Sequence, residues 1–573
     1  MTLTDERTAP TAPGPAGRPR RRRKRADAEP SAAETAELTR RPRLAPRVQV
    51  HEPTAEGSLW IVQSGQQYIR VGADMARLMR AMDGERDHAA LVSTLGGPWT
   101  ENAVATAVHN LQEMRLLEDG RIHRHSGTWF KYVPPLTLQF TVLKPQRLLN
   151  RLVPLIRLLA NRVAAVVAAI LVLGGLLALT VQAPALTQAL GQPLPFAVLL
   201  GVMTATILTT ALHEMGHGAV LTHYGGRPSR MGVMLFYMSP AFFCDVSDGW
   251  RLPHKEQRTR VALAGIVTQT VVAGTVSLSA LVLSAVNGPS LLHDGMLVFG
   301  VSTYLTGVLN FVPLVKLDGY LALMSHLDIP HLRDRSMTDA RRFLARILFG
   351  GRYRRELPGL TWAVPFGLAC MIFPLYLVAV AIGLWSDIVQ SLGLAGAAVM
   401  AAAISYLMYH AWNGGERLLR EARRAGAGLP RIALVSVLAV AAAAAVLLFV
   451  RLPYTVVGGF VQEGGQVRLV LADTADTDAV ARGSEVRLER RGLVIGIDVG
   501  TGVVAVDRGT RQTAPLSAFV PFREGEHFPM EVSGFALRTD KAPAERAGLA
   551  YVDAGTRPAW EWLYLKYVAP YGR

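Results

Sequence analysis

Hydrophobic residues are concentrated in the middle of the chain, in stretches long enough to cross a lipid bilayer as helices. Polar segments separate these stretches from one another. They cover roughly residues 163–182, 195–221, 261–286, 296–315, 361–385, 391–412 and 432–450. The pattern predicts a mainly α protein, a polytopic membrane helical bundle of about seven spans within residues 163–450.

The first 130 residues have a different pattern. Residues 1–50 are rich in Pro, Ala, Arg and Glu and lack apolar periodicity, which predicts a disordered basic tail. Within residues 51–130, alternating apolar and polar positions predict two strands, and three helices with apolar faces are expected to follow. Thr100 is expected to cap the third helix, and a hairpin is predicted at 116–122. This order of elements is typical of a small winged-helix domain.

Two further segments flank the predicted bundle. Residues 131–162 form a linker in which arginines alternate with apolar residues from 147 onward, as in a helix lying in the membrane interface. Residues 451–573 contain short alternating strands separated by Gly and Asp, so we expect a β-rich domain in which an aromatic helix covers 560–564. The predicted strands are 467–471, 485–489, 493–498 and 503–506.

Charge adds an orientation to this picture. The loops at 183–194, 287–295 and 386–390 contain no Lys or Arg, whereas those at 222–260, 316–360 and 413–431 contain many. Basic loops stay on the cytoplasmic side. We therefore expect a multi-pass protein of a bacterial-type cytoplasmic membrane, with a cytoplasmic N-terminus and an extracytoplasmic C-terminal domain. The net charge of +16 fits such loops, and the basic run at 20–25 fits an anionic inner leaflet better than nucleic acid.

One apolar stretch contains a cluster of ionisable residues. Within 195–221 the sequence reads Ala211-Leu-His-Glu-Met-Gly-His-Gly218. On a helix, His213 and His217 lie one turn apart on the same face, a spacing that suits two ligands of one Zn²⁺ ion. Glu214 is placed beside them as a general base. In a soluble helix the same motif could be a solvated polar face, but burying these groups in an apolar span is costly without a partner.

A catalytic zinc site needs a third protein ligand and an open position. Asp318, in Leu317-Asp318-Gly319, follows the predicted fourth span and lies on the same side of the membrane as the histidines. Asp-Gly is also a common turn pair, but with the two histidines the carboxylate predicts a His-His-Asp set. Cys244 could approach a metal, although a small buried hydrophobic role is favoured.

These motifs resemble the site-2 protease family of intramembrane zinc metalloproteases. The resemblance covers residues 195–320 and rests on the His213 motif, Asn310-Phe-Val-Pro313 and Leu317-Asp318-Gly319. It implies zinc ligation by His213, His217 and Asp318, catalysis by Glu214, and a place for Asn310 near the substrate or oxyanion. Asn310 is less securely placed, because its motif ends five residues before Asp318. Asp245 and Asp248 are expected to be structural.

The N-terminal domain resembles PqqD-like domains, which recognise the leader peptides of ribosomally made, modified peptides. The resembling segments are Tyr68-Ile-Arg-Val-Gly72, Leu78-Met-Arg-Ala-Met-Asp-Gly84 and Leu111-Gln-Glu-Met-Arg-Leu-Leu-Glu118. The resemblance implies that a peptide adds along a strand edge. A winged helix is more often a DNA binder, but few basic residues in the third helix argue against nucleic acid.

The domain pair leads to a functional hypothesis. It resembles maturation proteases of modified-peptide pathways, including daptide-type ones, which implies a zinc-dependent membrane endopeptidase that removes the leader from a small peptide precursor. Two alternatives remain: regulated intramembrane proteolysis of a membrane-anchored signalling protein, and a non-catalytic peptide-binding scaffold. The expected partners are a precursor peptide or a membrane-anchored protein substrate, together with the lipid bilayer.

Overall fold

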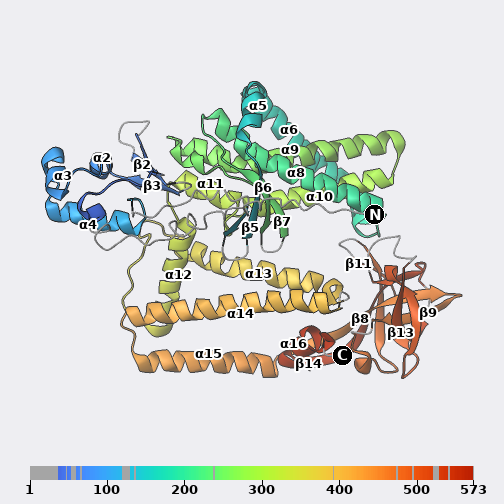
Figure 1. The fold of residues 1–573 in the computed structure, drawn as a ribbon. Coiled ribbons are helices and arrows are strands. Elements are labelled where there is room, and N and C mark those ends of the chain that lie inside the picture. The colour runs from blue at the N-terminus through green and yellow to red at the C-terminus, as the bar shows by residue number, and fades with distance from the viewer. Residues whose placement is uncertain are drawn as a thin grey trace, which may run out of the picture. The chain divides into compact units, whose positions relative to one another are not determined.

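The chain forms two compact units in the computed structural model (Figure 1). The first unit contains residues 1–143, 235–238 and 247–253, and the second contains 144–234, 239–246 and 254–573. The structure describes residues 37–571 except 47, 53–59, 65–66, 119–129, 134–136, 237–238, 391–392, 473–474, 493–495, 520–527 and 540–542.

The first unit is built on a small antiparallel sheet and three helices. The strands β1 (Val48–His51), β2 (Trp60–Ser64) and β3 (Gln67–Val71) pair in the order β1-β2-β3. The helices are α2 (Ala73–Ala81), α3 (His88–Leu95) and α4 (Glu101–Glu113). The Thr100 hydroxyl accepts a hydrogen bond from the Ala103 N–H, so the predicted cap of the third helix is confirmed.

This unit begins earlier than the expected boundary at residue 51. Ala45 and Val48 are buried in the same core as Leu78, Met79 and Val108, and Leu44 packs against that core. The reason is that the apolar residues just after the basic tail fill the space between the sheet and the helices. The tail at 1–36 and most of the hairpin predicted at 116–122 lie outside the described residues.

The remaining strands of the linker and loop regions are short. A hairpin forms between β4 (Phe130–Val133) and β5 (Thr137–Leu143), and a 3-10 turn, η2, covers Ser247–Arg251. Two further strands, β6 (Met231–Phe236) and β7 (Ser239–Cys244), follow the helix that carries the His213 motif.

The second unit is mainly helical. Its first helices are α5 (Gln146–Leu159), α6 (Arg162–Val181), α7 (Ala183–Leu190), α8 (Phe196–His223), α9 (Lys255–Asn287) and α10 (Leu291–Phe311). They are followed by α11 (Asp318–Leu327), α12 (Leu332–Phe349), α13 (Ala363–Gln390), α14 (Gly393–Arg424) and α15 (Leu429–Phe449). The predicted interfacial segment is thus a helix, α5.

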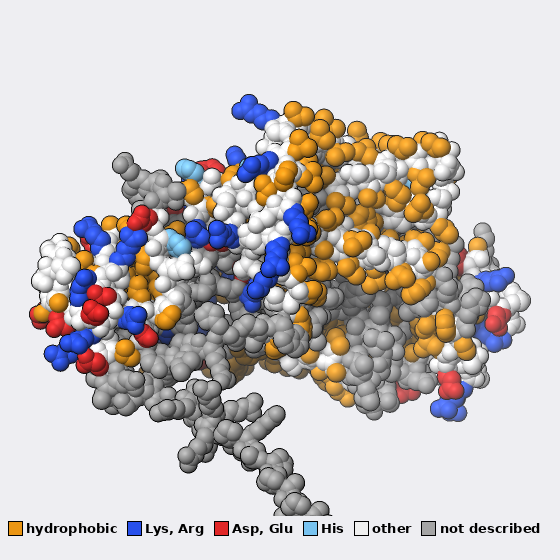
Figure 2. Space-filling model, turned by 45° about the horizontal axis from the view of Figure 1, so that its top comes forward, with side chains coloured by type: hydrophobic (Ala, Val, Ile, Leu, Met, Phe, Trp, Pro, Cys, Tyr) orange, Lys and Arg blue, Asp and Glu red, His pale blue; other side chains and the backbone are white. Residues whose placement is uncertain are grey.

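Five of the described helices are long and apolar enough to cross a membrane, namely α6, α8, α9, α13 and α15. Most of the predicted stretch 296–315 lies in α10, and residues 393–412 lie in α14, but these two helices are not among the five, so the count of seven is not confirmed. Figure 2 shows a face on which hydrophobic side chains cover a broad area with Lys and Arg at its margin. A soluble protein rarely exposes so large an apolar surface.

Within the bundle, α9 is the central helix. It packs against α6, α8, α10 and α11, so residues from four other helices lie along its length. Small residues allow this approach: a Cβ on Gly274 would collide with the Leu171 carbonyl of α6. Close contact through small residues is typical of helices packed in membranes.

The C-terminal region is a β-barrel-like domain. Its seven strands have the order β11-β10-β14-β8-β9-β13-β12, and an additional pairing joins β11 to β13. They are β8 (Arg451–Glu463), β9 (Gln466–Leu471), β10 (Glu485–Arg491), β11 (Gly496–Val504), β12 (Thr510–Pro515), β13 (Pro529–Thr539) and β14 (Ala547–Pro558). The aromatic helix is α16 (Ala559–Tyr567), whose Trp562 indole donates to the Pro453 carbonyl.

One strand prediction in this domain was wrong. The segments 493–498 and 503–506 were expected to be separate strands, but β11 covers Gly496–Val504 and so joins the described end of the first segment to the start of the second. The glycines between them do not end the strand, because Gly500 pairs with Leu488 beside a register shift in β10.

Candidate metal centre

Three side chains converge inside the second unit. His213 and His217 come from α8, where they lie one turn apart, and Asp318 is the first residue of α11. Both imidazoles are buried, with 4% and 5% of their residue surfaces exposed. One potential ligand atom from each of the three residues lies within 4.8 Å of the others. The structure thus brings together the three residues that the sequence predicted as ligands.

The distances among these atoms fit one small cation. The two Nε2 atoms are 3.2 Å apart, His213 Nε2 is 2.9 Å from Asp318 Oδ2, and His217 Nε2 is 3.4 Å from Asp318 Oδ1. Ligand atoms about 2.0–2.2 Å from a tetrahedral zinc ion are separated by roughly 3.3–3.6 Å. The observed spacing is close to that geometry.

The hydrogen bonds of the rings determine which nitrogens face the centre. His213 Nδ1 lies 2.6 Å from Gln269 Oε1, and His217 Nδ1 lies 2.7 Å from the Val261 carbonyl oxygen. Both partners are acceptors, so each Nδ1 carries the proton and donates it. Each neutral ring then presents an unprotonated Nε2 to the centre. The centre is therefore lined by two imidazole lone pairs and a carboxylate.

The carboxylate of Asp318 turns both of its oxygens toward the two rings, with Oδ2 near His213 Nε2 and Oδ1 near His217 Nε2. Its Oδ2 is buried and makes no geometrically good hydrogen bond among the described residues. A buried oxygen of this kind needs a partner, which a metal ion would supply.

The space between the three ligands depends on α9. Val261, Gly265 and Gln269 are spaced four residues apart, so they form one stripe of α9 that faces the two histidines. A Cβ at Gly265 would collide with Nε2 of both His213 and His217. Glycine at this position therefore leaves room at the centre. The residues present fit a bound zinc ion.

Glu214 has a different environment from the three ligands. It is not part of the cluster that could hold a metal, and its Oε2 accepts a hydrogen bond of 2.7 Å from the Cys244 N–H at the end of β7. Among the described residues, no donor is bonded to Oε1. One oxygen is thus held by the backbone while the other remains available to a substrate or water.

Cys244 contributes its backbone rather than its thiol. Burial and the nearby carboxylates of Glu214 and Asp245 raise the pKa of the Cys244 thiol to about 12, and Cys244 is not among the three residues whose ligand atoms converge. Asp245 accepts from the Ser229 hydroxyl and Asp248 pairs with Arg251. The expectation that these two aspartates are structural agrees with those contacts.

Asn310 lies at the edge of the site. Its Nδ2 is 3.5 Å from Gln269 Oε1, the atom that also accepts from His213. Asn310 is therefore linked to a ligand through Gln269. Sequence reasoning missed Gln269, although it is the one amide side chain in the apolar stretch 261–286 and such a group requires a partner there.

Comparisons with protein-family models, curated proteins and solved structures find no match for this chain. The interpretation of the site therefore depends on its own geometry.

Proposed function

We propose that the protein is a zinc-dependent membrane endopeptidase that cleaves a small peptide precursor. The observation that carries this proposal is the convergence of two imidazole lone pairs and one carboxylate in a buried space, beside a carboxylate that is not a ligand. A structural zinc site usually has four protein ligands, whereas three leave a position for chemistry. The resemblance to site-2 proteases supports the same reading.

Each residue then has a defined role. His213, His217 and Asp318 would hold the zinc ion, and Gln269 and Val261 fix the two rings in the binding tautomer. Zinc, when bound, would acidify a water and polarise the scissile carbonyl. Glu214, held by the Cys244 N–H, accepts the proton of the attacking water.

Hydrolysis is completed by the same carboxylate. The water oxygen bonds to the carbonyl carbon, the C–N bond breaks, and Glu214 passes the proton to the leaving nitrogen. Because the site lies among apolar helices, a helical substrate must unwind locally before its carbonyl is accessible. We infer that the cleaved segment contains helix-breaking residues. By the same resemblance, Asn310 would contact that segment or the developing oxyanion.

The first unit would recognise the leader peptide as a PqqD-like winged-helix domain. Two features support this role. β3 is an outer strand of its three-stranded sheet, so a peptide strand can add beside it. The third helix, α4, has no Lys or Arg within Glu101–Glu113, which is a poor composition for reading DNA.

The membrane orientation belongs to the same proposal. If α10 and α14 cross the membrane together with the five apolar helices, seven spans would leave the N-terminus and the basic loops in the cytoplasm and the barrel-like domain outside. The leader-binding domain, the end of α8 with its two histidines and the start of α11 with Asp318 would then be on the same side of the membrane.

The proposal is tested by comparing wild type with Glu214→Gln in cells at equal membrane abundance, using mass spectrometry of peptide N-termini. We expect a short peptide that is trimmed by the wild type alone, because the amide cannot accept the water proton. Identical peptide profiles would instead assign the protein to non-catalytic peptide binding. Cleavage of a membrane-anchored signalling protein in place of a small peptide would favour regulated proteolysis.

A further inference from the structure

An arginine-lined cavity lies between α12, the loop that follows it and the end of α14. Its volume is about 630 Å³, and its lining includes Arg342, Arg352, Arg354, Arg355 and Arg424. Glu356 and Glu421 are the acidic residues of the lining. Five guanidinium groups against two carboxylates leave the cavity strongly cationic. None of these residues belongs to the metal centre.

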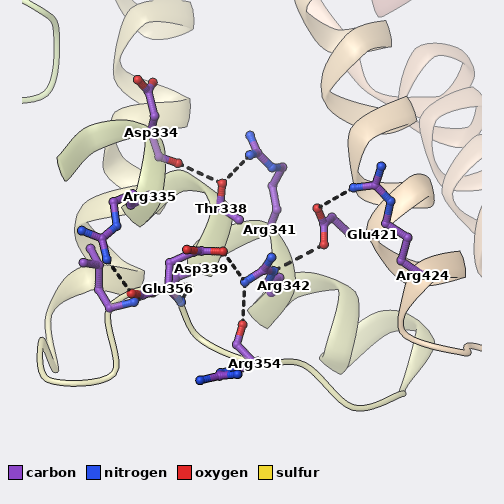
Figure 3. Close-up of polar contacts among 11 residues, drawn as sticks. Asp334, Arg335, Thr338, Asp339, Arg341, Arg342, Arg354, Glu356, Glu421 and Arg424 are labelled. Carbon is purple, nitrogen blue, oxygen red and sulfur yellow. Dashed lines mark hydrogen bonds and ion pairs between the residues drawn. The ribbon is translucent and has the colours of Figure 1, made fainter. Parts of the chain in front are cut away.

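The walls of the cavity are held by specific hydrogen bonds (Figure 3). The buried carboxylate of Asp339 accepts the N–H groups of Glu356 at 2.6 Å and Leu357 at 3.0 Å. Arg342 donates to the Arg354 carbonyl at 2.6 Å. These bonds hold the backbone of the loop against α12, so the positions of its arginines are fixed by the fold.

Both carboxylates in the lining already have a partner. Arg342 pairs with Glu356 at 2.9 Å and with Glu421 at 3.4 Å. In the described part of the chain, no carboxylate lies within ion-pair distance of Arg352, Arg354 or Arg355. Among the described residues, no carboxylate neutralises their charge.

The hydroxyl group of Tyr353 is a second, independent observation that points to a ligand in this cavity. This hydroxyl is buried and has no hydrogen-bond partner among the described residues, although Tyr353 lines the cavity. Buried hydroxyl groups are normally paired, so this one needs a partner from outside the described residues. An acceptor oxygen of a bound anion would satisfy it.

The cavity is located where two apolar helices begin. α13 starts at Ala363 and α15 at Leu429, each within a few residues of the lining. Apolar side chains are exposed nearby, with Phe343 44%, Ile347 56% and Leu429 70% accessible. Cationic groups next to exposed apolar ones match a molecule with a charged head and a hydrocarbon tail.

We propose that this cavity is a binding site for a phosphate group. Guanidinium groups bind phosphate through two parallel hydrogen bonds, and the unpaired arginines supply several such donors. The group could belong to an anionic phospholipid or to a free phosphate compound. The nearby span ends and exposed apolar residues favour the phospholipid.

The test uses the purified full-length protein and the triple variant Arg352→Gln, Arg354→Gln and Arg355→Gln. These side chains make no ion pair with described residues, so the fold should be retained. The matched control is Arg346→Gln, Arg420→Gln and Arg423→Gln, which removes the same charge from exposed arginines outside the lining. It measures the non-specific attraction to a charged membrane.

Two probes distinguish the sources of phosphate. Nanodiscs containing phosphatidylglycerol, compared with phosphatidylcholine, report lipid binding, and inorganic pyrophosphate in calorimetry reports soluble anions. We expect the cavity variant to bind phosphatidylglycerol roughly 10–100-fold more weakly than the control variant, since hydrogen bonds to charged groups are lost. Tyr353→Phe, which removes one hydroxyl and no charge, should also weaken binding.

The outcomes are separable. Loss of phosphatidylglycerol binding supports a lipid site, whereas loss of pyrophosphate binding with lipid binding unchanged supports a site for free phosphate. If the cavity variant and the control bind both probes equally well, and Tyr353→Phe equals wild type, the cavity is not a phosphate site and the proposal is overturned.

Discussion

His213 and His217 are each held by a hydrogen bond from the ring nitrogen that faces away from the centre. Gln269 Oε1 and the Val261 carbonyl accept those bonds at 2.6 and 2.7 Å. The difference between the two partners is useful, because the side chain can be replaced and the backbone carbonyl cannot. Gln269 therefore gives direct access to the orientation of one ligand without changing the ligand.

Replacing Gln269 with Leu should weaken zinc binding about 10–100-fold, the usual cost of losing the partner of a metal-binding histidine. His213 would lose the acceptor that fixes its tautomer, while both histidines and Asp318 would remain. Affinity is measured by competition with a chelator of known zinc affinity.

The chain contains a matched control for this substitution. Gln182 Oε1 accepts a 2.9 Å hydrogen bond from His293 Nε2, and both residues are buried. Gln182→Leu removes an equivalent Gln–His contact outside the metal centre, so its zinc affinity should equal that of wild type. Equal affinities in Gln269→Leu and Gln182→Leu would show that Gln269 does not orient a ligand.

At the scale of elements, the site combines three segments that are distant in sequence. They are the helix α8, the end of the strand β7 and the beginning of the helix α11. Periodicity and length were sufficient to predict helices over 195–221 and 261–286, because apolar residues dominate them. Periodicity and length could not show which backbone groups of other elements form hydrogen bonds with the side chains of these helices. The Cys244 N–H of β7 reaches Glu214 through tertiary packing, and no side-chain pattern records a backbone donor.

Substitution of Cys244 separates the backbone from the thiol. Cys244→Pro removes the N–H that holds Glu214 Oε2, so peptide cleavage should fall substantially while zinc content is retained. Cys244→Ala keeps that N–H and should cleave like wild type with full zinc content. The measurements are turnover of a precursor peptide and metal analysis. Loss of zinc in Cys244→Ala would instead make the thiol a ligand.

At the scale of the whole molecule, the two units have separate hydrophobic cores. The core of the first unit is formed around Val62, Leu78 and Leu111, and the barrel-like domain has its own core around Phe460 and Leu469. Composition predicted the apolar spans and the flanking polar regions, but the first unit begins before residue 51 and includes residues 247–253 through tertiary contacts that composition does not record. The sequence was less informative for β8, β13 and β14, whose long pairings across the barrel depend on contacts between distant segments.

Separate cores make a deletion informative. A chain lacking residues 1–130 should keep its zinc ion and cleave a leaderless fragment at an unchanged kcat. Its KM for the full precursor should rise, because leader binding contributes to both the ground state and the transition state. An unchanged KM for the full precursor would contradict leader recognition by the first unit.

The central claim is that His213, His217 and Asp318 hold zinc, and metal analysis of purified protein tests it most directly. We expect one zinc ion per chain in wild type and in Glu214→Gln, since Glu214 is not in the ligand cluster, and loss of that ion in Asp318→Ala. Protein that contains no zinc after purification and zinc addition, or an Asp318→Ala variant that retains a full equivalent, would contradict the account.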